Sequence, residues 1–425
     1  MTEQFLSFVW KYQKFDKQNL RTSTGEPLEV FNIGYQNENA GADFEMVRIF
    51  WDNKEWIGTA EIHLKSSDWD AHQHTKNNAY NNVVLHIVWE DDKNIVRPDG
   101  STIPTLALKN RTPVYLYQRW RGLELNKNSI ACSSYLPEIN DLTKAQLLEN
   151  ALLHRLQKKA EIVKQIWIEN ELDWEETAYQ LLAKSLGMKV NQEPFLRLAK
   201  SLSFKIILKN RDNLFALEAL LFGVAGFLEG ETQDQYHQQL QKEYRFLAHK
   251  YQLKDKNLQL KDWFFLRMRP ANFPTLRIAQ LAQILHQNPT IFSLLIEENS
   301  ASLIKNLNIS ASSYWETHYQ FGKETKNKHT QLGKNTIENL LINAIIPLKS
   351  CYYLEKDNDN GLVQVTEILT NIPAEKNQYI ELWAKNNIKV KNSYDSQALL
   401  EQYNHFCSQK RCLECVIGVQ IIGKT

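Results

Sequence analysis

The sequence predicts an α+β protein in which a mixed sheet at the N-terminus is followed by a mainly helical domain. Short segments that alternate apolar and polar residues dominate up to residue 134, with Asn, Gly, Asp and Pro clusters between them. After that point, apolar residues recur at helical spacing. We therefore expect a sheet domain over residues 1–134 and a helical domain over residues 135–425.

The N-terminal domain is expected to follow the order α-β-β-β-α-β. Apolar residues at helical spacing indicate a short opening helix, and they are Phe5, Phe8, Val9 and Tyr12. Strands are expected at LEVFNIGY, DFEMVRIFW, EWIGTAEIHLK, NVVLHIVWE and IPTLALK. The polar segment SDWDAHQHTKNNAYNN opens on a Ser/Asp cap signal and fits a short helix. A parallel pair of strands joined through that helix is expected to cross over right-handedly.

The second domain is expected to consist of amphipathic helices. The segment TKAQLLENALLHRLQKKAEIVKQIWIEN has apolar residues at i, i+3, i+4 and i+7 with charges between them. Later segments continue this pattern, among them DWEETAYQLLAKSLG, NLFALEALLFGVAGFL and FPTLRIAQLAQIL. We find no repeat of fixed period, which argues against a solenoid of uniform units.

The composition is that of an ordinary globular protein, with 43% hydrophobic and 23% charged residues. A net charge of +1 provides no general attraction for nucleic acid, so a polyanion site must be a local patch. No apolar run approaches the roughly 20 residues that span a bilayer, and no membrane partner is expected. Five cysteines, without a secretory signal at the N-terminus, predict a reducing, cytoplasmic location.

One predicted strand carries Glu61, His63 and Lys65 at alternate positions, so their side chains are expected on one face. Asp43 opens the strand before it. Carboxylates on neighbouring strands can bind Mg²⁺ or Mn²⁺, which lowers the pKa of a water ligand and stabilises charge on a phosphodiester oxygen. His63 or Lys65 would then orient that water or neutralise the transition state. A solvated strand face is the alternative interpretation of the pattern.

The pattern Asp-x17-Glu-x-His-x-Lys, within the order α-β-β-β-α-β, resembles the PD-(D/E)xK nuclease superfamily. The resemblance implies a restriction-endonuclease-like core over residues 1–134, with Asp43 and Glu61 as its two acids. His63 stands where the superfamily usually has lysine, and Lys65 is one pleat further along. The implied activity is metal-dependent hydrolysis of nucleic acid, with DNA expected rather than RNA.

The segment that follows the strand with Glu61, His63 and Lys65 carries further candidate site residues. His72, His74 and Tyr80 are expected to contact substrate, where exonuclease members of that superfamily often have a Gln and a Tyr. Alternatively, His63 joins the two histidines and an acid to bind Zn²⁺, which predicts a zinc-dependent hydrolase with another substrate. A further alternative is a non-catalytic nucleic-acid-binding or scaffold protein with a degenerate nuclease core.

Three arginines, Arg267, Arg269 and Arg277, lie around a Pro/Asn turn that opens a predicted helix. They could contact substrate phosphates, because helix N-termini attract anions and guanidinium groups bind phosphate. The alternative is that Arg269 and Asn272 only tie the loop to carbonyl groups and carboxylates of the helical domain.

Three cysteines lie close together near the C-terminus, and they are Cys407, Cys412 and Cys415. Neighbouring thiolates in a reducing compartment can bind Zn²⁺ or an Fe–S cluster, both of which need about four ligands. The candidates for a fourth ligand are Cys132, Cys351 and His405. Cys132 has a parallel in some PD-(D/E)xK exonucleases, which hold an Fe–S cluster through one upstream and three C-terminal cysteines. The alternative is that these residues are small buried side chains of a terminal helix.

A second resemblance covers essentially the whole chain. The runs NENAGADF, EIHLKSSDW, ALLFGVAGFL, RMRPANFPTLRIAQLA, HYQFGK and CLECVIG resemble an uncharacterised bacterial domain-of-unknown-function family. That family implies no activity, so the expectation of a nuclease depends on the N-terminal core alone.

Overall fold

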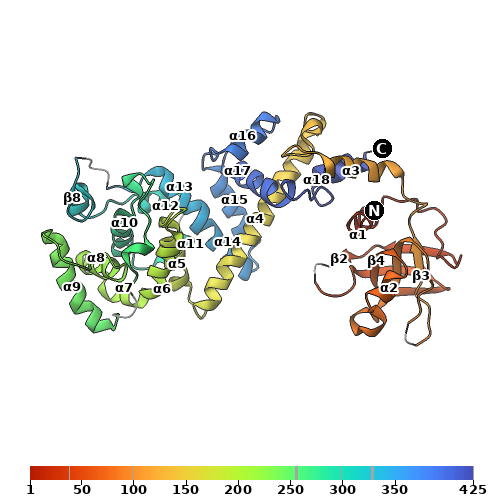
Figure 1. Ribbon diagram of the computed structural model, residues 1–425, viewed down its shortest axis with the longest axis horizontal. Helices are drawn as coiled ribbons and strands as arrows, with labels where there is room; N and C mark the ends of the chain where they lie inside the picture. The colour runs from red at the N-terminus through yellow and green to blue at the C-terminus, as the bar shows by residue number, and fades with distance from the viewer. Residues whose placement is uncertain (38, 98, 254–256, 298, 327–329, 425) are drawn as a thin grey trace. The chain divides into compact units, whose positions relative to one another are not determined.

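The computed structural model describes residues 1–37, 39–97, 99–253, 257–297, 299–326 and 330–424 (Figure 1). The chain forms two compact units. Unit 1 comprises Met1–Ala151, Lys376–Lys389 and Ala398–Thr425, and unit 2 comprises Leu152–Glu375 and Val390–Gln397. The C-terminal segment therefore belongs to the same unit as the N-terminal sheet.

Unit 1 contains a mixed sheet, and the predicted α+β class is confirmed. Its strands are β1 (Leu28–Asn32), β2 (Tyr35–Gln36), β3 (Phe44–Trp51), β4 (Lys54–Lys65), β5 (Val83–Glu90) and β6 (Thr105–Ala107). The hydrogen-bonded order is β1-β3-β4-β5-β6, with β2 paired to β3. Strand β3 is antiparallel to β1 and β4, whereas β5 is parallel to β4 and β6.

Helix α1 (Glu3–Lys11) precedes the sheet and packs on β4. The Thr2 hydroxyl caps it by accepting a hydrogen bond from the Phe5 backbone N–H at 3.2 Å. Its apolar stripe is fully buried, as the helical spacing of Phe5, Phe8 and Val9 predicts. The helix thus brings its first turn to the same strand that carries the candidate metal ligands.

The polar segment between β4 and β5 is less helical than the sequence predicts. It forms the single turn α2 (Asp68–Ala71) and two 3₁₀ turns, η1 (His74–Lys76) and η2 (Asn78–Tyr80). Gln73 adopts a left-handed conformation with φ of 58°, which ends α2. The Asn77 side chain accepts a hydrogen bond from the Ala79 backbone at 3.1 Å and so favours a turn.

The close approach of β4 to the start of β5 requires a glycine. A Cβ atom on Gly58 would lie 2.4 Å from the Asn82 carbonyl oxygen and 2.6 Å from Val84 Cγ1. Further along the pair, Glu61 is in register with His86. This approach sets the position of the β4 side chains relative to β5.

Helices complete unit 1. They are α3 (Val114–Leu125), the first part of α4 (Asp141–Glu169), α16 (Gln378–Lys385), the last part of α17 (Ser393–Glu401), the π-helical η9 (Gln402–Cys407) and α18 (Val416–Gly423). Helix α18 packs on α3, so residues nearly 300 positions apart in the sequence become neighbours.

Unit 2 is predominantly helical, as the apolar spacing after residue 134 predicts. Besides the rest of α4, its helices are α5 (Trp174–Leu186), α6 (Gln192–Ser201), α7 (Phe204–Asn210), α8 (Leu214–Val224), α9 (Gln235–Tyr251), α10 (Pro274–Gln287), α11 (Ile291–Glu297), α12 (Ser300–Leu307), α13 (Lys334–Leu340), α14 (Ile346–Glu355) and α15 (Asp359–Thr370). A small sheet pairs β7 (His318–Gln320) with β8 (Lys323–Glu324). Across the described residues, every helix is too short or too polar to cross a bilayer.

Candidate metal centre

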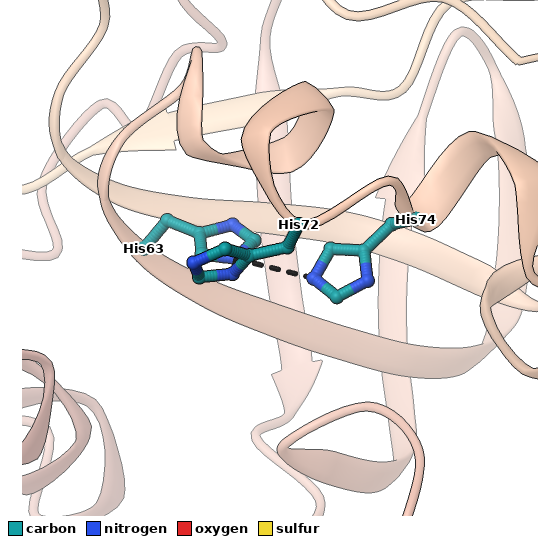
Figure 2. A group of neighbouring side chains, drawn as sticks. All are labelled: His63, His72 and His74. Atoms are coloured by element: carbon teal, nitrogen blue, oxygen red, sulfur yellow. Dashed lines mark hydrogen bonds between the residues drawn. The ribbon is translucent and has the colours of Figure 1, made fainter.

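Three histidines of unit 1 meet at one point (Figure 2). His63 Nε2 lies 3.1 Å from His72 Nδ1 and 3.3 Å from His74 Nε2. One ring nitrogen from each residue lies within 4.8 Å of the other two. His63 comes from β4, whereas His72 ends α2 and His74 begins η1. The left-handed Gln73 between the last two allows both rings to face the strand.

Glu61 adds a carboxylate to the histidines. Its Oε1 atom is 3.3 Å from His74 Nε2 and 3.6 Å from His63 Nε2. Glu61 and His63 are two residues apart on β4, so both project from one face of the strand. Zinc bonds of about 2.0–2.1 Å in a tetrahedral site separate the ligand atoms by about 3.4 Å. The three ring nitrogens therefore lie close enough together to hold one transition-metal ion, whereas Glu61 is near His63 and His74 only and would have to move towards His72 to become a fourth ligand.

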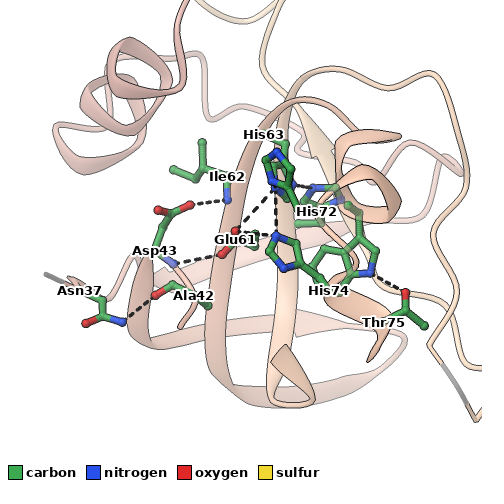
Figure 3. A network of polar contacts seen from close by, with 11 residues as sticks. Asn37, Ala42, Asp43, Glu61, Ile62, His63, His72, His74 and Thr75 are labelled. Carbon is green, nitrogen blue, oxygen red and sulfur yellow. Dashed lines mark hydrogen bonds and ion pairs between the residues drawn. The ribbon is translucent and has the colours of Figure 1, made fainter. Parts of the chain in front are cut away.

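Asp43, the residue immediately before β3, lies beside Glu61 of the neighbouring strand β4 (Figure 3). Its backbone N–H donates to Glu61 Oε2 at 3.2 Å, and its own Oδ2 accepts from the Ile62 backbone N–H at 2.9 Å. Glu61 lies between Asp43 and the histidines in this view. The two predicted acids are therefore brought together, with one of them directed towards the imidazoles.

Glu3 is a third acid near this site, and the sequence analysis missed it. It lies in the first turn of α1, where burial raises its pKa, and its charge adds to the upward shift of the Glu61 pKa. An acidic residue in the first turn of a helix is common, because it interacts favourably with the helix dipole. No local signal distinguishes Glu3 from such a residue.

His86 and two aromatic residues hold the imidazoles in place. His86 Nε2 is 2.8 Å from His63 Nδ1, and both rings are almost fully buried. When His63 Nε2 offers its lone pair to an ion, its Nδ1–H donates to His86, which fixes the ring orientation. The Tyr80 ring stacks on His74 with centroids 3.7 Å apart. Trp69, which is 2% exposed, packs edge-on against His63, and its Nε1 donates to the Thr75 hydroxyl.

Burial determines the protonation of the cluster. It raises the pKa of Glu61 to about 8, and the neighbouring Asp43 and Glu3 add to this effect. Burial together with the adjacent imidazoles lowers the pKa of His63 and His74 to about 4. Both rings are therefore neutral at pH 7, which is the form that binds a metal ion.

The other predicted residues are not members of this cluster. Lys65 is exposed at the end of β4, where its backbone N–H donates to Asp68 Oδ2 at 2.9 Å. Arg267 and Arg269 are exposed residues of unit 2.

Arg277, the third arginine predicted to contact phosphate, is instead buried and has a structural role. It donates to Asn272 Oδ1 at 2.6 Å and to the Thr336 hydroxyl at 2.8 Å. Thus Asn272 and the start of α10 are tied together by a side chain that is unavailable to an external phosphate.

Comparison with known proteins gives one match. A family model described as "Protein of unknown function (DUF2851)" matches residues 3–378. No curated protein and no solved structure matches the chain. The matched range includes all the ligands of the candidate metal centre and most of unit 2.

Proposed function

We propose that this chain, which belongs to the DUF2851 family, is a metal-dependent nuclease. The observation that carries the proposal is the convergence of three ring nitrogens, two of which lie 3.3 and 3.6 Å from the Glu61 carboxylate oxygen. Imidazole nitrogen favours Zn²⁺ and other transition metals, whereas Mg²⁺ prefers an all-oxygen set. We therefore assign Zn²⁺, in preference to Mg²⁺ or Mn²⁺, to the three histidines and Glu61.

The order of elements in unit 1 supports a phosphodiester as the substrate. Helix α1 is followed by the antiparallel strands β1, β3 and β4, then by α2 and the parallel strand β5. Apart from the two-residue strand β2 between β1 and β3, this matches the α-β-β-β-α-β order expected for a restriction-endonuclease-like core. Asp43 immediately precedes β3 and Glu61 lies on β4, as that resemblance implies for its two acids.

Different residues of the site can have different roles in hydrolysis. A bound metal ion lowers the pKa of a water ligand and stabilises negative charge on the phosphodiester oxygen. His72 is exposed, so substrate would approach from its side of the cluster. Asp43, whose pKa is raised by burial, adjoins Glu61, and we assign to it the role of the base that accepts the proton of the attacking water. The exposed Lys76, two residues after His74, provides positive charge for a neighbouring phosphate.

The test is cleavage of single- and double-stranded DNA and RNA by metal-free protein to which Zn²⁺, Mn²⁺ or Mg²⁺ is added. We expect cleavage with Zn²⁺, and a rate lowered about 10²–10⁴-fold in Asp43→Ala, because it removes the general base. Asp70→Ala is the matched control, since Asp70 is an exposed aspartate that pairs with Lys93 at 2.7 Å. We expect this control to cleave at the wild-type rate.

Two outcomes would contradict the nuclease proposal. Protein that binds the ion but cleaves none of the four nucleic-acid substrates would favour a zinc-dependent hydrolase with another substrate. Protein that binds nucleic acid equally well with and without the ion, and cleaves nothing, would favour a non-catalytic binding protein.

A further inference from the structure

Four cysteines from two distant parts of the sequence meet in unit 1. Cys132 follows α3, whereas Cys407, Cys412 and Cys415 belong to the C-terminal segment. All four are free thiols. Burial raises the pKa of Cys407, and the other three thiols each add to this effect, as expected if the four sulfurs face one another.

Specific contacts arrange the C-terminal cysteines and fasten their segment to the one that precedes Cys132. Gln402 Nε2 is 3.3 Å from Cys415 Sγ and 3.8 Å from Cys407 Sγ. The Lys410 ammonium donates to the Asn126 carbonyl oxygen at 2.8 Å and to the Asn128 carbonyl oxygen at 3.0 Å. The C-terminal loop is therefore fastened to the segment that leads into Cys132.

The backbone around Cys415 is shaped for a thiolate. Cys415 is the N-cap residue of α18; burial raises the pKa of its thiol, and the nearby backbone N–H groups of Gly418 and Ile417 offset part of this effect. Such donors stabilise negative charge on sulfur and tune a cluster bound to it. Gly418 has no room for a side chain, because a Cβ atom there would lie 2.0 Å from the Cys412 carbonyl oxygen. The turn from Cys412 to α18 is thus compact enough to direct both sulfurs to the same place.

The spacing of the sulfurs distinguishes the possible metals. A single Zn²⁺ ion with four thiolate ligands, at about 2.3 Å each, requires all the sulfurs to lie about 3.8 Å apart. In this chain, no three of the four sulfurs, all of them described by the structure, lie within 4.8 Å of one another. A polynuclear cluster binds its thiolates through different iron atoms and so accepts sulfurs that lie further apart.

We propose that these four cysteines bind an iron–sulfur cluster. The Lys410 ammonium lies close enough to influence Cys132 and Cys412, and it offsets part of the negative charge of four thiolates. The cluster would join the C-terminal segment covalently to the region after α3 and so stabilise unit 1. The inference is independent of the metal centre at the histidines.

The test is the iron and acid-labile sulfide content of the full-length chain, produced with iron and cysteine supplied and purified without oxygen. We expect brown protein with about two or about four iron atoms per chain, and an equal amount of sulfide. Cys132→Ser is expected to lose most of the iron. Cys351→Ser is the matched control, since Cys351 is a buried cysteine of α14 in unit 2, and it should retain the wild-type iron content.

The iron and sulfide content of the wild-type protein tests the proposal even if Cys132→Ser fails to fold. About one equivalent of zinc bound by the four cysteines without sulfide would overturn the proposal in favour of a mononuclear site. Four thiols that react freely with a thiol reagent in metal-free native protein, with no iron recovered from any preparation, would overturn it as well.

Discussion

Replacing His72 with alanine is expected to weaken zinc binding by at least about 100-fold and to abolish hydrolysis, while the protein stays folded. Mutation of groups that merely orient metal ligands lowers affinity about 10–100-fold, so loss of a ligand should have at least the larger effect. His72 is exposed, and its removal leaves no buried cavity. Competition with a chromophoric chelator measures the affinity, and far-ultraviolet circular dichroism checks the fold.

Lys76→Ala is the matched control for this substitution. Lys76 is an exposed residue at the end of η1, four positions after His72. The Lys76→Ala variant should retain the wild-type zinc affinity. Equal zinc affinity for His72→Ala and wild-type protein would mean that His72 is a solvated surface histidine.

Glu61→Gln is expected to stabilise unit 1 in the metal-free protein at pH 9, by a few kcal/mol, and to have little effect at pH 4.5. Burial raises the pKa of Glu61 from 4.5 to about 8. Between these values the folded state keeps the proton that the unfolded state loses, so the stability of the wild-type protein falls as pH rises. Each pKa unit corresponds to about 1.4 kcal/mol, and the effect is complete above pH 8. Glutamine removes this penalty because its amide can donate to His74 and accept from the Asp43 N–H.

Hydrogen exchange of the β5 amides, compared between variants at each pH, measures this difference in stability. Glu29→Gln is the control, because Glu29 is exposed on β1 and its substitution should leave the exchange rates at their wild-type values. With zinc present, the wild-type protein should be more stable than Glu61→Gln, since it gains binding free energy that the glutamine variant loses in part. Equal exchange rates for Glu61→Gln and wild-type protein at pH 9 would contradict the burial of an uncompensated carboxylate.

Periodicity predicted the parts of the site that lie on one element. The alternation along β4 correctly put Glu61 and His63 on one face, and the apolar spacing correctly gave the buried stripe of α1. These predictions succeed because side-chain direction along a strand or helix follows from local geometry alone.

The remaining ligands depend on features that periodicity does not encode. His72 and His74 reach His63 only because Gln73 adopts a left-handed conformation, which its sequence context does not indicate. Lys65 shares the alternation of Glu61, yet it is exposed because β4 ends there.

Long-range packing determines which residue joins the three C-terminal cysteines, a question that their spacing in the sequence left open. Cys132 meets the C-terminal cysteines because α18 packs on α3, and the identity of a fourth partner could not be deduced from spacing. The membership of Ala398–Thr425 in unit 1 has the same cause, since composition and periodicity report only on neighbours in the sequence.

The central claim is that three imidazoles and Glu61 hold one ion, and anomalous diffraction at the zinc absorption edge tests it most directly. Crystals of protein loaded with zinc should show a peak about 2.1 Å from His63 Nε2, His72 Nδ1 and His74 Nε2, with the Glu61 carboxylate moved towards His72 to become the fourth ligand. A zinc-loaded crystal without a peak at this position, or with an ion bound by Asp43 and Glu61 and no histidine, would contradict the account.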